Sequence, residues 1–128
     1  MSNAVFLAIA GALGALSRYG LSLLAYRAMG DGFPYGTLLV NMLGSATFGF
    51  VMQVGLNTGF IPDSLRMATT IGFLGAFTTF STFSYETMRF LENGAWGPAA
   101  LNIAANVGLS VAAVMGGVLL GRVALSNS

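Results

Sequence analysis

The chain has 128 residues, of which 55% are hydrophobic and only 7% are charged, and its formal net charge is +1. Its mean hydropathy is +0.79, whereas soluble domains carry about 25% charged residues, so the composition predicts a protein embedded in a lipid bilayer. The small net charge argues against a nucleic-acid surface. The lack of cysteine and histidine, with only four acids, makes a metal or hydrolytic site hard to build, and we expect no enzyme.

Four apolar stretches predict an all-α membrane protein with a single four-helix transmembrane domain over residues 1–128. Each stretch is close to or above the about 20 residues that a spanning helix needs. The breaks between them read GDGFP, NTGFIPD and ENGAWGP, and each combines glycine and proline with an acid that requires water. The predicted helices cover approximately 4–28, 34–56, 65–91 and 98–122.

The first stretch places Arg18 near its middle, within GALGALSRYG. An arginine at that depth costs at least about 2.5–3.5 kcal/mol unless it is paired or faces water. One interpretation is structural, with Arg18 paired to a helix C-terminus or to a carboxylate such as Glu86. The other is functional, with its positive potential drawing anions toward a pathway.

The second stretch carries a polar stripe, because Thr37, Asn41 and Ser45 are spaced four apart and share one helical face. All three side chains can donate a hydrogen bond and none is an anion. The stripe therefore fits a path for a small anion. Hydrogen bonding between helices explains it equally simply, and periodicity alone favours that second explanation.

The third stretch is unusual, because residues 71–85 read IGFLGAFTTFSTFSY. Its centre is rich in residues of poor helix propensity, so we predict a break near Gly75–Thr79. A break in lipid is tolerated only where the freed backbone groups face protein or water. A continuous, tilted helix whose hydroxyls bond to its own carbonyls remains the alternative. Phe80 and Phe83, three residues apart, either pack or present their positive ring edges to an anion.

The fourth stretch repeats the pattern of the second, with Asn102, Asn106 and Ser110 again spaced four apart. Two such stripes and the hydroxyl cluster of the third stretch would together line a narrow hydrophilic path. Bonding between helices again remains the alternative.

The arginines other than Arg18 are balanced between the two ends of the predicted helices. One end holds Arg66 and Arg122, and the other holds Arg27 and Arg89. Membrane orientation normally follows an excess of positive residues on the cytoplasmic side. Without that excess, the chain is expected to insert both ways and to form an antiparallel homodimer with its two-fold axis in the membrane plane. The alternative is that loop length or the free amino terminus still selects one orientation.

Three motifs together resemble the small bacterial fluoride channels, the Fluc or CrcB family. They are GALGALSRYG, GTLLVNMLGS and GFLGAFTTFSTFSYE, and the resemblance covers nearly the whole chain. It implies a fluoride-selective channel in the bacterial inner membrane, through which toxic fluoride leaves the cell passively. It further implies an antiparallel, dual-topology homodimer with two fluoride pores along its interface.

The resemblance also assigns roles to individual residues. It implies a structural sodium ion at the two-fold axis, held by the backbone carbonyls of Gly75 and Thr78, and it places Arg18 at a vestibule. The residues that it implies for the fluoride pore are Phe80, Phe83, Asn41, Ser81, Thr82 and Ser110.

A second class of function also fits the layout, namely a dual-topology transporter of the small multidrug-resistance type. Such a transporter needs a carboxylate within the first helix to exchange protons for cationic drugs. The first predicted helix carries Arg18 and no acid, so its charge favours an anion.

Overall fold

The computed structural model describes residues 2–127, which are helical throughout apart from short connections, with no β-strand among them. Three helices, which correspond to three of the four predicted spans, are long and apolar enough to cross a membrane. The third stretch, in contrast, is divided into shorter segments. The elements in chain order are α1 (Asn3–Met29), α2 (Tyr35–Asn57), α3 (Asp63–Met67), the π-helix η1 (Ala68–Leu74), α4 (Gly75–Phe77), α5 (Phe80–Glu92) and α6 (Trp96–Ser126).

The observed ends of the long helices lie within a few residues of the predicted ones. The largest difference is α6, which continues to Ser126 instead of ending near residue 122. Arg122 is a good helix former and no glycine or proline follows it, so nothing there stops the helix. At the end of α1, Gly30 adopts a φ of 77° and its amide bonds back to the Tyr26 carbonyl. A residue with a side chain is strained in that conformation.

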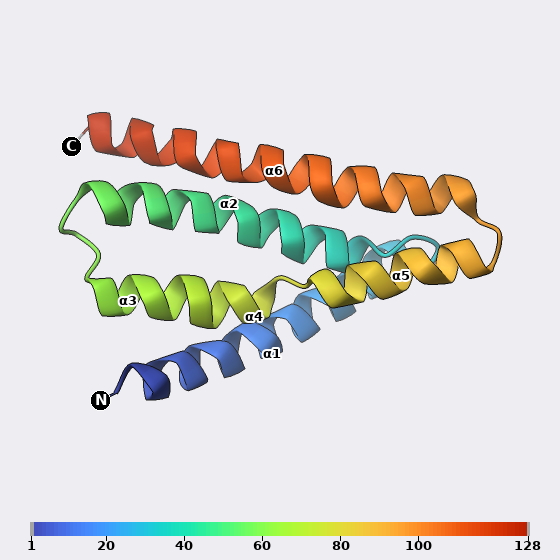
Figure 1. The fold of residues 1–128 in the computed structure, drawn as a ribbon, viewed down its shortest axis with the longest axis horizontal. Coiled ribbons are helices and arrows are strands. Elements are labelled where there is room, and N and C mark those ends of the chain that lie inside the picture. The colour runs from blue at the N-terminus through green and yellow to red at the C-terminus, as the bar shows by residue number, and fades with distance from the viewer. Residues whose placement is uncertain (1, 128) are drawn as a thin grey trace.

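We call residues 63–92, which comprise α3, η1, α4 and α5, the third segment. The helices form one layered bundle in which α2 lies between α6 and this third segment (Figure 1). α6 runs along α2, while α1 crosses obliquely against η1 and α4. Both termini lie at the same end as the α2–α3 connection, and the α1–α2 and α5–α6 connections lie at the opposite end. The bundle therefore separates Arg66 and Arg122 from Arg27 and Arg89, as four predicted spans require.

The third segment changes direction at Thr78 and Thr79. α4 ends at Phe77, both threonines have extended backbones with ψ of 160° and 123°, and α5 begins at Phe80. The Thr79 hydroxyl accepts a hydrogen bond from the Thr82 amide and so caps the new helix. The segment before this interruption is itself irregular, because η1 is a π-helix, a conformation that is often found at functional sites.

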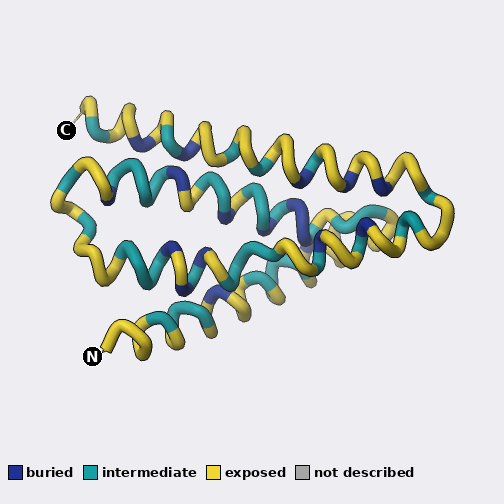
Figure 2. Tube along the Cα trace, viewed as in Figure 1, coloured by how far each residue is buried: buried dark blue, intermediate teal, exposed yellow. Residues whose placement is uncertain are grey.

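Small residues let the long helices approach one another closely. A Cβ atom at Gly117 of α6 would fall against the Ala46 carbonyl of α2, and one at Gly49 against the Val114 carbonyl. Most of the outer surface of the bundle is exposed, and buried positions concentrate where helices face one another (Figure 2). Close backbone packing of this kind holds helices together in lipid, where no hydrophobic driving force exists between them.

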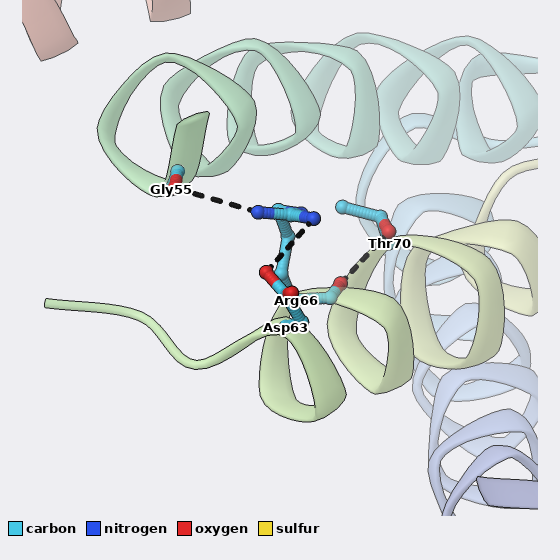
Figure 3. A network of polar contacts seen from close by, with 4 residues as sticks. All are labelled: Gly55, Asp63, Arg66 and Thr70. Atoms are coloured by element: carbon cyan, nitrogen blue, oxygen red, sulfur yellow. Dashed lines mark hydrogen bonds and ion pairs between the residues drawn. The ribbon is translucent and has the colours of Figure 1, made fainter. Parts of the chain in front are cut away.

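A second contact fixes the start of the third segment against α2. Arg66 forms an ion pair with Asp63 at 3.1 Å and donates to the Gly55 carbonyl near the end of α2 at 3.4 Å (Figure 3). The Thr70 hydroxyl donates to the Arg66 carbonyl at 2.8 Å. This network, which we call the Arg66 clamp, attaches the irregular third segment to the regular second helix.

The glycines at positions 116 and 117 provide a test of this packing. Gly117→Leu should lower stability by about 1–3 kcal/mol, because overpacking forces α2 and α6 apart. Gly116→Leu is the matched control, because a Cβ at Gly116 meets nothing within 4 Å. Thermal unfolding in detergent would measure both, and equal melting temperatures would contradict the close approach of α6 to Ala46.

Candidate functional site

The interruption at Thr78 and Thr79 is held from outside by Asn41 of α2. The Asn41 Oδ1 accepts a hydrogen bond from the Thr79 amide at 2.8 Å, and its Nδ2 donates to the Thr79 carbonyl at 3.1 Å. The same Nδ2 also donates to Asn106 Oδ1 of α6 at 2.9 Å. Both protons of the Asn41 amide are therefore used, and one side chain joins α2, the interruption and α6.

Gly44 lies three residues after Asn41 on α2 and allows the interruption to come close. A Cβ atom at Gly44 would overlap the Thr78 methyl group and contact the Phe77 ring. Asn41 and Gly44 share a face because residues three apart on a helix are neighbours. On one side of α2, Asn41 therefore provides a polar partner for Thr79, and Gly44 leaves space for Thr78.

The backbone carbonyls just before the interruption differ in which groups donate hydrogen bonds to them. Leu74 O accepts from both the amide and the hydroxyl of Thr78 at 3.0 Å. Ala76 O accepts from Arg18 Nε of α1, also at 3.0 Å. In a continuous helix Gly75 O would accept from the Thr79 amide, but that amide donates to Asn41 instead.

The Thr78 carbonyl, like that of Gly75, does not receive the hydrogen bond that a continuous helix would give it. Its donor in a continuous helix would be the Thr82 amide, which instead donates to the Thr79 hydroxyl at 3.2 Å. Gly75 is exposed and Thr78 is half-buried. For both carbonyls that the resemblance assigns to sodium, the amide that would donate in a continuous helix therefore bonds elsewhere.

A cavity of about 380 Å³ lies beside the interruption, between α2, α5 and α6. Phe80 and Phe83 border it with their rings in an edge-to-face arrangement, with centroids 5.4 Å apart at 60°. Phe83 is only 7% exposed, whereas Phe80 is 77% exposed in the single chain. The polar residues that line the cavity are Asn41, Ser45, Thr78, Thr79, Asn106 and Ser110.

Ser110 is a buried polar residue of this cavity whose side chain has no hydrogen-bond partner among the described residues. Its hydroxyl oxygen is buried, and within residues 2–127 it has no hydrogen-bond partner. No aspartate or glutamate lines the cavity. An unpaired buried hydroxyl costs about 1–3 kcal/mol, so a ligand in the cavity that accepts a hydrogen bond from Ser110 would remove that cost.

The polar residues continue past the cavity along α5 and α6. Asn106 Nδ2 donates to Asn102, and Asn102 donates to the Thr87 hydroxyl at 3.1 Å. Beside this chain, the Thr37 hydroxyl donates to Glu86 Oε2 at 2.5 Å. Sequence reasoning did not place Glu86 and Thr87 in the site. The signal was present, because they follow Phe83 by three and four residues and so share its face.

The structure brings some of the predicted site residues together and separates others. Asn41, Phe80, Phe83 and Ser110 line the cavity, and Gly75 and Thr78 border it as well. Ser81 and Thr82 do not line it. Ser81 is exposed, and Thr82 bonds to Thr79 at the interruption. Arg18 meets the interruption through Ala76, which decides between the two partners considered for it: the helix end and not Glu86.

Comparison with known proteins shows the family to which this chain belongs. A family profile described as "CrcB-like protein, Camphor Resistance (CrcB)" matches residues 5–118. A relative from Dehalococcoides mccartyi, named "Fluoride-specific ion channel FluC", is 49% identical over all 128 residues and 98% of its own length. Relatives with the same name from Geobacter metallireducens and Syntrophotalea carbinolica are 48% and 49% identical, cover 95% and 92% of this chain, and are matched over 98% and 96% of their own lengths. The chain therefore belongs to the CrcB family.

Proposed function

We propose that this protein is a fluoride-specific ion channel through which fluoride leaves the cell down its own electrochemical gradient. It is a multi-pass bacterial membrane protein, and its family is one of ion channels and not of enzymes. The observation that carries the proposal is the unpaired, buried hydroxyl of Ser110 in a cavity lined by three phenylalanines, Phe48, Phe80 and Phe83, and by no acid. The names of the relatives support fluoride as the ion.

The chemistry of the cavity fits an anion that is small and strongly hydrated. Such an ion leaves water only where strong donors replace its hydration shell, and it must then be released easily. Ser110 offers a hydroxyl, and the edges of Phe80 and Phe83 offer positive electrostatic potential without tight binding. Asn41 faces the same pore in this proposal, but its amide protons are already bonded to Thr79 and Asn106, so it shapes the wall.

A fluoride efflux assay in liposomes tests the function. The wild type should pass fluoride far faster than chloride, because hydroxyl donors and ring edges favour the smaller anion. Ser110→Ala should slow fluoride by about tenfold to a hundredfold, since one hydrogen bond to a charged group contributes about 1.5–3 kcal/mol. Ser84→Ala is the matched control, because the Ser84 hydroxyl already bonds to the Phe80 carbonyl on an exposed face.

Two outcomes would contradict this proposal. Equal fluxes of fluoride and chloride would show that the channel does not select fluoride. Fluoride driven uphill by an imposed proton or sodium gradient would mean a coupled transporter. Passive flow is expected because the central parts of the helices contain no histidine or aspartate, and the one nearby acid, Glu86, lies toward the end of its helix and does not line the cavity.

The working channel in this proposal is an antiparallel homodimer of chains inserted in opposite orientations. In a single chain, Phe80 and Gly75 are exposed at mid-bundle, and the cavity beside them is open. Backbone polar groups exposed to hydrocarbon cost several kcal/mol each, so a second copy is needed to cover this face. That copy would also give exposed Ser81 a place along the fluoride path, together with Thr82.

Charge placed at one end of the bundle tests dual topology. Two lysines added after Ser128 should bias insertion to one orientation and abolish most fluoride flux, because the antiparallel partner is missing. Two added glutamines are the neutral control. Co-expression with Asp31→Lys, which adds charge at the opposite end, should restore flux. Full activity of the biased protein alone would exclude the antiparallel dimer.

The carbonyls of Gly75 and Thr78 fit a structural sodium ion shared by the two chains. Their helical donors bond elsewhere, as the hydrogen bonds of Thr79 and Thr82 indicate. Hard cations take oxygen ligands, and neutral carbonyls without carboxylates suit a monovalent ion better than calcium or magnesium. Within the described residues no cluster of three or more acids, histidines or cysteines provides a divalent site. Bound there, sodium would neutralise the carbonyl dipoles and join the subunits.

Removal of sodium tests this site. With sodium replaced on both sides of the liposome by N-methylglucamine, fluoride flux should decay over time as the site empties. Addition of millimolar sodium should restore it, because the ion is structural and is not carried with fluoride. Lithium, potassium and N-methylglucamine serve as the comparison ions. Flux that stays constant through prolonged, verified sodium removal would exclude a structural sodium ion.

A further inference from the structure

We propose that Arg18 is a positioning residue that holds the interruption of the third segment open through the single donor at its Nε. The inference deepens the proposed function, on which it rests, because the interruption supplies the carbonyls assigned to sodium. It differs from the vestibule role that the family resemblance implies, in which the charge of Arg18 is what matters. Here the essential property is a hydrogen-bond donor at one place on α1.

The contact between Arg18 and α4 is built into the packing of α1. A Cβ atom at Gly14 would overlap the Phe73 carbonyl, so the backbones of α1 and η1 are in close contact there. Arg18 is one helical turn further along α1, on the same face, and Ala76 is three residues beyond Phe73. The glycine contact therefore sets the register that brings Arg18 Nε to 3.0 Å from the Ala76 carbonyl.

The bond from Arg18 competes directly with continuation of the helix. In an unbroken helix Ala76 O would accept from the Phe80 amide, and Gly75 O would accept from the Thr79 amide. Arg18 occupies the first of these carbonyls, and Asn41 takes the Thr79 amide away from the second. Loss of the Arg18 donor would leave Ala76 O unsatisfied in a membrane, and a helical bond to Phe80 would satisfy it. The helix would then continue through Thr78 and Thr79, and the interruption would be lost.

No carboxylate explains the position of Arg18. Among residues 2–127 the ion pair within 4 Å is that of Arg66 with Asp63, and Glu86 bonds to Thr37. Arg18 therefore contributes two separable properties, a donor at Nε and a positive charge. They can be separated experimentally, because the Nε2 of glutamine lies at the same distance along the side chain as the Nε of arginine. Arg18→Gln keeps the donor and removes the charge, whereas Arg18→Met has similar length and neither property.

The experiment measures hydrogen–deuterium exchange of the amides from residues 74 to 82 in the purified, full-length protein, with and without sodium. It also measures the sodium concentration that gives half-maximal fluoride flux in liposomes. Arg18→Gln should keep the exchange pattern and sodium dependence of the wild type, although its fluoride flux is free to change with the lost charge. Arg18→Met should change exchange at Thr78 and Thr79 by about tenfold, as expected for one buried hydrogen bond, and should raise the sodium requirement.

Each outcome decides the proposal. Wild-type behaviour of Arg18→Gln together with the changes in Arg18→Met would support it. Equal changes in both variants would overturn it in favour of a role for the charge, and unchanged exchange in both would exclude any positioning role. If Arg18→Met does not fold, exchange in Arg18→Gln still decides. A wild type that carries no fluoride would contradict the proposed function, while the exchange data would still test the role of Arg18 at the interruption.

Discussion

The structure depends on one constraint, which is that a backbone interrupted inside a membrane must find new hydrogen-bond partners for the groups it releases. Three side-chain groups meet this requirement at the interruption of the third segment. Asn41 binds the amide and carbonyl of Thr79, Arg18 binds the carbonyl of Ala76, and the Thr79 hydroxyl binds the Thr82 amide. Because these groups come from α1, α2 and the segment itself, three elements must assemble before the interruption is stable.

The polar residues of the bundle divide into two functional groups that share the same helical stripes. Asn41, Asn102 and Asn106 bond to one another or to neighbouring helices and hold α2, α5 and α6 together. Ser110, on the same stripe of α6, has no partner among the described residues and faces the cavity. In the proposed channel, structural bonding and ion conduction are therefore not alternatives for these stripes, because successive turns of one helix would serve the two purposes.

Composition and periodicity were sufficient to predict the helical fold, because apolar stretches of spanning length leave little choice of structure in lipid. They left two possibilities for the third stretch, a break near Gly75–Thr79 or a continuous, tilted helix, and the structure interrupts the helix at Thr78 and Thr79. Spacing within a segment could not reveal which other segment would meet it. For that reason the partners of Asn41 and Arg18, the place of Glu86 beside Thr37, and the Arg66 clamp required the assembled bundle. The π-helix also has no signature in the apolar pattern.

The paired hydrogen bonds between Asn41 and Thr79 reproduce, within an all-helical protein, the exchange that two residues make in an antiparallel β-ladder. The side-chain amide takes the place of a peptide group from a neighbouring strand. Only a primary amide has an acceptor and two donors at the required separation. An aspartate, although identical in shape, would direct oxygen toward the oxygens of both Thr79 and Asn106. Position 41 is therefore more constrained in its chemistry than its moderate burial suggests. Deamidation, which converts the amide to an acid, would remove the two hydrogen bonds that Asn41 donates to Thr79 and Asn106.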